Sequence, residues 1–405
     1  MRATKNKFVP AFVFIFSFLS PAVHPLSLSL DPTFRETGVA SKTFASREEY
    51  LLSRFALSLK PSGIRGDFWR VEADLEILAF GGDYLSTDEW RTLVLPLLEG
   101  RPAVEWSKLF LSANDLDIRG RAYRLYGAVD GGPFEFSLGR MRNAFGNTRI
   151  FLSPLDRFDG LPTPVSEPLE RPGSDTAKLK VSGPGGWRFQ GAYLWDQRNR
   201  LYRSFIQGQG LLREGLEAGL MAGQLAPRTR GMGAGLGLNV FEGQLRWEGT
   251  YNEKKEEKFS LEIVNFMPVL KIETVTRVFK RHLVHWERAY AGDWVFAAEY
   301  LHNGSGESRS ENYDVLRLLL GDDLYLGRDY IGAVLSHTVS ATWAWTLEGL
   351  ANAKDGSFAW YPELRRLSAD SSIEAKLRFS GYAGPQSGEF RRLPDRLQLL
   401  VSWYF

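Results

Sequence analysis

The chain has 405 residues, of which 50 are basic and 48 acidic, so its formal net charge is only +2. This balance gives no overall attraction to nucleic acid or to an anionic membrane surface. The chain contains no cysteine, which excludes disulfides and thiolate chemistry. Aromatic residues make up 13% of the sequence and include 12 Trp, so the fold must accommodate many aromatic side chains.

The N-terminus has the layout of a secretory signal peptide. Basic residues precede an apolar run over 8–19, and the small residues Ser20 and Ala22 fit positions −3 and −1 of a cleavage site. The run is shorter than the ~20 residues that a spanning helix needs, and no comparable run follows it. We therefore expect residues 1–22 to be a signal peptide and residues 23–48 to be an N-terminal periplasmic segment. An uncleaved anchor is the alternative.

From residue 49 onward the dominant pattern is alternation of apolar and polar residues, which is the period of a β-strand. In "DFWRVEADLEILAF" apolar residues alternate with Arg70, Glu72, Asp74 and Glu76. Equally clear alternation is found at 186–196, 243–251 and 372–382. Less regular segments of the same kind lie at 118–129, 133–142, 174–183, 199–206, 211–222, 258–265, 293–301, 312–320, 326–336 and 340–350. Glycine-rich and polar turn sequences separate them.

One stretch breaks this pattern. In "STDEWRTLVLPLLEG" the apolar residues between Trp90 and Leu98 follow helical spacing, and Ser86 with Glu89 could form a capping box. Pro96 limits the length of a helix here. We expect a short helix within a loop. "NEKKEEK", at 252–258, is a charge run that is typical of a solvated loop tip.

The last strand helps to decide between a soluble sandwich and a membrane barrel, because both architectures alternate. Its apolar face ends in large aromatic residues and consists of Leu397, Leu399, Val401, Trp403 and Phe405. Bacterial outer-membrane barrels typically close with a strand that ends in an aromatic residue, and this segment resembles such a strand. Aromatic residues near strand ends and charges of both signs on the polar faces also favour a barrel. Lipid would then cover the apolar face.

The sequence therefore predicts an all-β fold, a transmembrane antiparallel β-barrel formed by residues 49–405. A strand of ~10 residues with its share of turn and loop uses about 20 residues, which gives about 16–18 strands. A barrel of this size leaves an aqueous channel unless something plugs it.

The longest gap in the strand pattern is 143–175, which contains five prolines and charges of both signs. A gap this long is usually a functional loop or a disordered segment. Its apolar residues, among them Phe145, Phe151 and Leu155, favour a packed loop. Two interpretations stay open: the loop folds into the barrel and narrows the pore, or it is an external loop whose charges are solvated.

The same stretch resembles a segment of poorly characterised porin-like barrels of Gram-negative envelopes. The resemblance covers about a tenth of the chain and consists of a Gly-Arg strand end, a turn with glycine, an "sPxDxF" core and an "E-x-x-G-x-D" return. The matching positions are Gly139, Arg140, Gly146, Pro154, Asp156, Phe158, Arg171, Gly173 and Asp175. The chain departs from the pattern at Phe145, where a Trp is usual. The resemblance implies the barrel fold but no substrate.

Arginine and carboxylate residues of this region are the candidate site. They could lock the loop through bidentate carboxylate–guanidinium pairs, or they could form a pore constriction. The candidates are Arg140, Arg142, Arg149, Asp156, Arg157, Asp159, Glu170, Arg171 and Asp175, and Glu167 is a further carboxylate of the loop.

Catalytic and metal sites find little support. His282 and His285 are three residues apart, and Ser336 directly precedes His337, so the members of each pair point to opposite faces of a strand. Neither pair resembles a nucleophile with its base. We expect no enzyme, no cofactor and no metal.

The function predicted from these observations is a channel of the bacterial outer membrane for passive diffusion of small hydrophilic solutes. The alternative is a non-conducting barrel with a structural, adhesive or partner-binding role. Expected partners are outer-membrane lipid, the barrel-assembly machinery and the solutes, with a homotrimer as a further option and no nucleic acid. The near-balanced charge gives no indication of ion selectivity.

Overall fold

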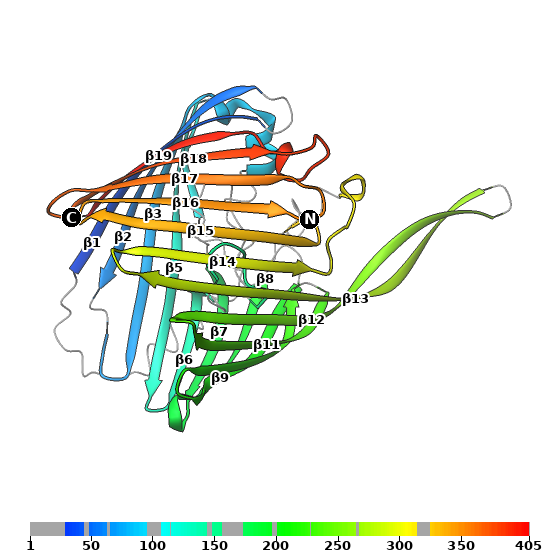
Figure 1. The fold of residues 1–405 in the computed structure, drawn as a ribbon, viewed down its shortest axis with the longest axis horizontal. Helices are drawn as coiled ribbons and strands as arrows, with labels where there is room; N and C mark the ends of the chain where they lie inside the picture. The colour runs from blue at the N-terminus through cyan, green and yellow to red at the C-terminus, as the bar shows by residue number, and fades with distance from the viewer. Residues whose placement is uncertain are drawn as a thin grey trace.

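The computed structural model describes residues 29–43, 48–62, 65–94, 107–113, 115–143, 148–155, 173–196, 201–226, 228–264, 267–313 and 325–404. Nearly all of them lie in one antiparallel sheet (Figure 1). Its strands are β1 (Ser29–Lys42), β2 (Glu49–Ser62), β3 (Trp69–Gly81), β4 (Ser107–Ser112), β5 (Leu116–Gly131), β6 (Phe134–Met141), β7 (Ser174–Ser182), β8 (Arg188–Asp196), β9 (Leu201–Arg213), β10 (Leu216–Ala226), β11 (Thr229–Val240), β12 (Gly243–Val264), β13 (Met267–Tyr290), β14 (Trp294–Asn303), β15 (Asp329–Ser340), β16 (Trp343–Asn352), β17 (Phe358–Leu367), β18 (Ile373–Ala383) and β19 (Arg396–Tyr404). Short helical turns are η1 (Asp83–Ser86), η2 (Trp90–Val94), η3 (Pro184–Gly186), η4 (Ser310–Asn312) and η5 (Phe390–Arg392).

The sheet closes on itself. β1 pairs with β2 on one side and with β19 on the other, so that Phe34 lies opposite both Leu57 and Trp403. The strands follow one another around the ring in chain order, except that β3 pairs directly with β5. β4 lies outside this succession and pairs with a stretch of β5 that β6 does not reach. The prediction of an antiparallel barrel of about 16–18 strands is confirmed, since 18 strands form the ring.

The predicted start of the barrel is wrong. Residues 23–48 were expected to form a periplasmic segment, yet 29–42 form β1, which pairs along its length with β2. The sequence "SLDPTFRETGVASK" alternates weakly and contains Pro32, so its own pattern gives little strand signal. Its position between β2 and β19 supplies hydrogen-bond partners on both sides, and these override the local preference.

The two faces of the strands differ as predicted for a membrane barrel. On β3, Leu75 and Ile77 are 41% and 43% exposed, whereas Glu76 between them is 5% exposed. On β19, Leu397 and Leu399 are 46% and 50% exposed, with Val401 and Trp403 on the same face. A soluble monomer rarely exposes apolar surface on this scale. Further exposed apolar residues of the outer face include Phe136, Leu179, Phe189, Ile206, Leu220, Met232, Val278, Ile331, Leu347, Leu364 and Leu377.

The predicted short helix is present as two helical turns, η1 and η2, but its cap differs. The hydroxyl of Thr87, not of Ser86, accepts the N–H of Trp90 at 3.2 Å, and Glu89 accepts the hydroxyl of Tyr84 at 2.7 Å. Tyr84, Leu85 and Trp90 form one buried cluster with Val39, Leu52, Leu78 and Phe80, on the inner side of β1–β3. No helix among the described residues is long and apolar enough to cross a membrane.

The hairpin of β12 and β13 projects from the barrel (Figure 1). The two strands pair from Gln244–Glu287 to Val264–Met267, whereas the pairing with β11 stops at Lys254 and the pairing with β14 stops at Arg281. The charge run at 252–258 therefore belongs to a strand, and the interpretation as a loop tip is wrong. Its partner stretch on β13 contains Thr274, Val275 and Thr276, and such β-branched residues favour an extended chain.

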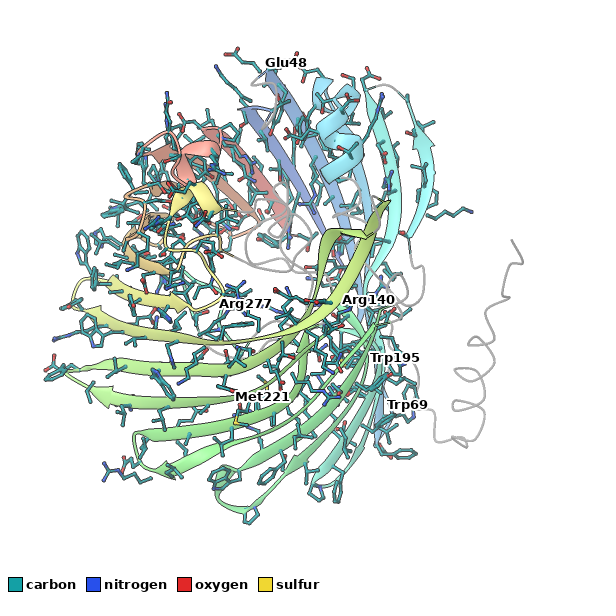
Figure 2. The ribbon with its side chains drawn as sticks, turned by 90° about the vertical axis from the view of Figure 1, so that its right-hand side faces the viewer. Glu48, Trp69, Arg140, Trp195, Met221 and Arg277 are labelled. Carbon is teal, nitrogen blue, oxygen red and sulfur yellow. The ribbon has the colours of Figure 1, made fainter. Side chains whose placement is uncertain are left out.

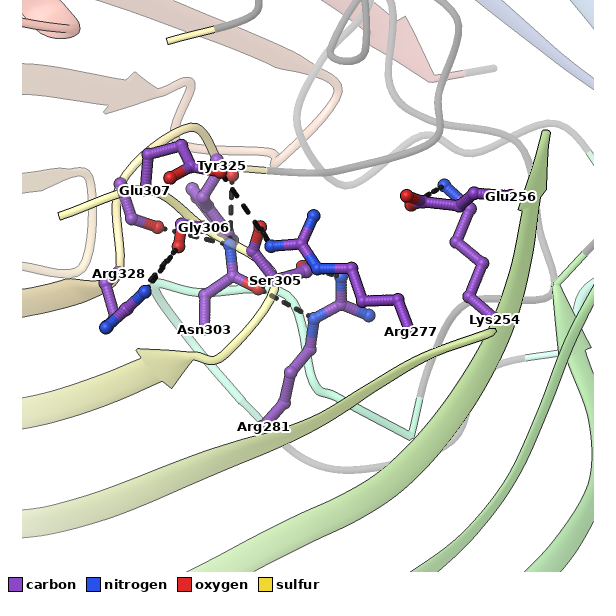
Figure 3. A network of polar contacts seen from close by, with 11 residues as sticks. Lys254, Glu256, Arg277, Arg281, Asn303, Ser305, Gly306, Glu307, Tyr325 and Arg328 are labelled. Carbon is purple, nitrogen blue, oxygen red and sulfur yellow. Dashed lines mark hydrogen bonds and ion pairs between the residues drawn. The ribbon is translucent and has the colours of Figure 1, made fainter. Parts of the chain in front are cut away.

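The base of this hairpin is braced by the connection from β14 to β15 (Figure 3). Arg281 donates to the side-chain oxygens of Asn303 and Ser305 at 2.9 and 2.6 Å, and Arg277 donates to the backbone carbonyl of Ser305 at 3.0 Å. Asn303 in turn donates to the carbonyl of Tyr325 at 3.0 Å. These contacts hold the point where the hairpin leaves the wall.

Candidate permeation pathway

The segment 148–155 lies inside the ring, against the wall formed by β11–β15. β6 ends at Met141, and β14 lies on the opposite side of the ring, with β7–β13 between them in one direction. Beyond the end of β6, the backbone N–H groups of Arg149, Ile150 and Phe151 bind a carboxylate of β14. Of the two alternatives for the long loop, the structure therefore places this part of it in the lumen.

Glu299 is the anchor of the segment. Its carboxylate accepts the N–H groups of Arg149, Ile150 and Phe151 at 2.6, 3.1 and 2.7 Å, and Nδ1 of His285 lies 2.8 Å from Oε1. The residue is only 2% exposed. A buried carboxylate costs free energy unless donors surround it, and here one carboxylate satisfies three backbone groups that would otherwise lack partners.

A second anchor lies further along the segment. Ser153 donates its hydroxyl to the carboxylate of Glu248 on β12. Leu155 then lies directly on β11, since a Cβ at Gly233 would come within 2.4 Å of its Cδ2 atom. A side chain at position 233 would force Leu155 to move, so glycine allows the close approach of Leu155 to β11.

Apolar contacts with β15 and with the residues that precede it also support the segment 148–155. The ring of Phe151 packs edge-on to Tyr325 at 5.7 Å between centroids and lies 6.0 Å from Tyr330. The hydroxyl of Tyr325 also accepts the N–H of Leu152 at 3.1 Å. Ile150 covers Gly332, whose absent Cβ would lie 2.8 Å from it.

Tyr330 connects this packing to the connection from β18 to β19. Its hydroxyl donates to Glu389, which also accepts the N–H of Leu326 at 3.0 Å and the amide of Asn352 at 3.0 Å. Asp355 accepts the N–H of Glu389 at 2.9 Å. Burial raises the pKa of Glu389 above its ordinary value, and the nearby Asp355 adds to the effect, although the donors oppose it.

Raising the pH is expected to weaken this loop cluster. Because folding raises the pKa of Glu389, the native state binds more protons than the unfolded chain between the unfolded pKa of about 4.3 and the higher folded pKa. The stability contribution is complete below the unfolded pKa and is lost as pH rises through the folded pKa. The thermal midpoint in detergent should fall from about pH 4 to pH 8 relative to that of Glu389→Gln. Parallel pH profiles for the two proteins would contradict this.

Arg140 and Asp175 join the two ends of the long loop. Arg140 is near the end of β6 and Asp175 is near the start of β7, and the register pairs them directly. The guanidinium approaches the carboxylate with Nε–Oδ1 at 3.0 Å and Nη2–Oδ2 at 3.4 Å, and it also donates to the carbonyl of Ala122 at 3.2 Å. Both side chains are 9% exposed. The pair has the fork geometry of a bidentate contact.

The other predicted site residues are dispersed. Arg149 binds Glu287 of β13 at 2.7 Å and Ser336 of β15 at 3.4 Å. Arg142 is exposed. Asp156, Arg157, Asp159, Glu167, Glu170, Arg171 and Phe405 lie outside the described residues, so a constriction that includes them stays a prediction.

The inner face of the remaining wall carries charges of both signs, as the polar faces of the strands predict. Ion pairs lie between Arg121 and Glu76 at 2.6 Å and between Arg119 and Asp117 at 2.5 Å. Arg365 binds Glu374 at 2.5 Å. Figure 2 looks into this ring of strands and shows side chains on both sides of the wall.

A cavity of about 410 Å³ lies beside the end of the folded-in segment, between Leu155 and the inner faces of β8–β12. Its polar lining comes from Arg188, Gln190, Gln207, Gln209, Glu217, Arg246 and Glu248. None of the residues that the structure describes fills this space on the side where the segment ends. We name this cavity the lumen recess.

Sequence reasoning missed the residues that hold the loop. Glu248 and Glu299 face the lumen, but nothing in their strands distinguishes them from other inward carboxylates, because their partners come from far along the chain. "GMGAGLGLN" did carry a signal. Its alternate glycines form the inner face of β11 under Leu155.

No protein-family model matches the chain, and no curated protein matches its sequence. Solved structures do resemble it. OccAB1 of Acinetobacter baumannii has a TM-score of 0.58 at 9% identity, covering 93% of this chain and 96% of that one. A BenF-like porin from Pseudomonas fluorescens has a TM-score of 0.56 at 12% identity, covering 94% and 98%. OccK8 (OprE) of Pseudomonas aeruginosa has a TM-score of 0.54 at 11% identity, also covering 94% and 98%.

These identities are low, so the likeness concerns the fold. It extends over nearly the whole of each chain, which excludes a match limited to a few hairpins. A closed antiparallel barrel with an apolar outer face is a transmembrane β-barrel, and the outer membrane is the place of such barrels. The chain has the fold of the Gram-negative outer-membrane porins.

Proposed function

We propose that the protein is a porin-like channel of the outer membrane through which small hydrophilic solutes diffuse passively. The observation that carries the proposal is the polar cavity between the folded-in segment 148–155 and the inner faces of β8–β12. The lining carries guanidinium, carboxylate and amide groups, and no apolar plug formed by the described residues fills the lumen recess. A barrel of 18 strands is wide enough for an aqueous channel.

The connections support an orientation. On one end of the ring the strands are joined by short turns, such as 132–133, 214–215 and 341–342, and the opposite end carries the longer connections. Outer-membrane barrels have short periplasmic turns and longer extracellular loops. We therefore place the β12–β13 hairpin and the Glu389 cluster outside the cell.

The other expectations remain part of the proposal. Residues 1–22 would be removed as a signal peptide after export. The barrel-assembly machinery would insert the chain into the outer membrane. A homotrimer would be detected by chemical crosslinking of the purified protein in detergent. The channel would carry no catalytic or cofactor chemistry.

A non-conducting barrel is the second candidate, and one observation favours it. Tyr84, Leu85 and Trp90 pack against the inner side of β1–β3, so a helical segment occupies part of the mouth. If this packing and the folded-in segment together sealed the lumen, the barrel would serve structure or partner binding.

Vesicle release distinguishes the two candidates. The mature protein is reconstituted into lipid vesicles that contain radiolabelled sucrose together with a fluorescent dextran of high molecular mass. The proposed channel releases sucrose and retains dextran, because the loop narrows the lumen. Retention of both solutes by correctly folded, heat-modifiable protein would favour the non-conducting barrel.

A further inference from the structure

The lumen recess has the size and composition of a small-molecule site, and its role rests on the proposed channel function. Its volume of about 410 Å³ falls within the range of roughly 300–1,000 Å³ that is typical of ligand pockets. It lies directly beside Leu155, the last described residue of the folded-in segment, so a solute that passes the segment on this side contacts its walls.

The recess exists because neighbouring strands present glycines to the lumen. Gly233, Gly235 and Gly237 alternate on β11 with Met232 and Leu236, which are 62% and 43% exposed on the outer face. The register extends this surface sideways, since Gly235 pairs with Gly219 of β10. Without side chains, this part of the wall is set back from the lumen.

A row of amides forms one side of the recess. Gln190 on β8 donates from Nε2 to Oε1 of Gln207 on β9 at 2.5 Å, and Gln207 donates to Oε1 of Gln209 at 3.2 Å. Among the described residues, Oε1 of Gln190 and Nε2 of Gln209 have no further partner. The row therefore leaves an amide acceptor at one end and an amide donor at the other.

The charges that the described residues bring to the recess balance. Arg188 and Arg246 supply two positive groups, and Glu217 and Glu248 supply two negative ones. Glu217 and Arg246 flank Gly237, whose Cβ would lie 3.9 Å from Oε2 of Glu217 and 3.9 Å from Cγ of Arg246. A lining without net charge gives no advantage to an ion of either sign, and selectivity then depends on hydrogen bonding.

We propose that the lumen recess binds neutral, hydroxyl-rich solutes of sugar size during their passage. A hydroxyl group both donates and accepts, so adjacent hydroxyls match the acceptor of Gln190 and the donor of Gln209. The glycine surface of β11 leaves room for a ring-sized molecule. The recess thus defines the solute class of the channel, and this class goes beyond passage of small hydrophilic molecules in general.

The test uses three solutes of similar size and different charge: glucose, gluconate and glucosamine. Their efflux from vesicles at low solute concentration is measured for the wild type and for Gln207→Leu, which removes the central amide at similar volume. The matched control is Gln398→Leu, because Gln398 faces the lumen from β19, on another wall of the ring. We expect Gln207→Leu to lower glucose efflux about fivefold, with gluconate and glucosamine unchanged, and the control to leave all three unchanged.

The outcomes separate the two proposals. If the wild type releases the solutes but Gln207→Leu changes the efflux of all three equally, the assignment of the recess is overturned and the channel function stands. No efflux of any solute from the wild type would overturn the channel function itself, and the assignment with it.

A second variant keeps the test decisive if Gln207→Leu does not fold. Gly235→Leu fills the recess, and its Cβ would make only ordinary contacts, the nearest at 3.7 Å from Leu155. Its control is Gly349→Leu on β16, where the nearest atom is the carbonyl of Ala359 at 3.9 Å and the residue alternates with inward Glu348 and Leu350. Gly235→Leu should abolish the faster efflux of glucose relative to gluconate and glucosamine, and Gly349→Leu should retain it. A retained preference in Gly235→Leu would overturn the proposal.

Discussion

Replacement of Glu299 by alanine should release the folded-in segment from the wall and increase the conductance of the channel. The substitution leaves the N–H groups of Arg149, Ile150 and Phe151 without their common acceptor, and His285 loses its partner. Hydrogen bonds to a charged group contribute about 1.5–3 kcal/mol each and are not additive. A total loss of about 3 kcal/mol shifts the balance between attached and detached segment roughly 100-fold.

The measurement is single-channel recording of Glu299→Ala beside Glu363→Ala. Glu363 lies on β17 between β16 and β18, and among the described residues none forms a hydrogen bond or ion pair with its carboxylate. Both variants remove one carboxylate, so a general effect of charge on conductance would appear in both. We expect larger and noisier steps in Glu299→Ala only. Equal conductance changes in the two variants would show that the segment does not limit the pore.

Replacement of Arg140 by alanine should destabilise the barrel strongly. The variant leaves the carboxylate of Asp175 buried without its guanidinium partner, and removing one partner of a buried ion pair typically costs about 3–5 kcal/mol. The double variant Arg140→Met, Asp175→Leu removes both charges, so it should be less destabilised than Arg140→Ala.

The comparison is Lys42→Ala. Lys42 lies 3.2 Å from Glu49, but the two side chains are 52% and 82% exposed, and exposed pairs contribute at most about 1 kcal/mol. Urea unfolding of the three variants in detergent, monitored by heat-modifiable gel mobility, gives the order. A loss in Arg140→Ala no larger than that in Lys42→Ala would mean that the pair does not hold the ends of the loop.

The sequence predicts the barrel well because a lipid-facing strand must alternate. Leu75, Glu76 and Ile77 show the two environments within three residues, and this signal is local. It is weak where polar and small residues form a strand, as in β1, and where charged residues continue a strand beyond the membrane, as in β12. In both cases the pairing partner, not the strand's own residues, determines the structure.

The site is less predictable because its contacts join distant parts of the chain. Arg140 and Asp175 could be identified because they flank one loop and match a motif. Glu299, in contrast, lies far downstream of segment 148–155 in the chain and contacts it only in the folded ring. The amide row and the glycine face of β11 can likewise be recognised as one surface only when the pairing of β8–β12 is known. Alternation gives the side of the wall on which a residue lies, but not its partner across the lumen.

The most direct test of a polar lumen narrowed by segment 148–155 is single-channel recording of the refolded mature wild type in a planar bilayer. We predict stable, stepwise conductance of uniform size, which increases in Glu299→Ala. Correctly folded, heat-modifiable protein that inserts into the bilayer without any conductance would contradict the channel.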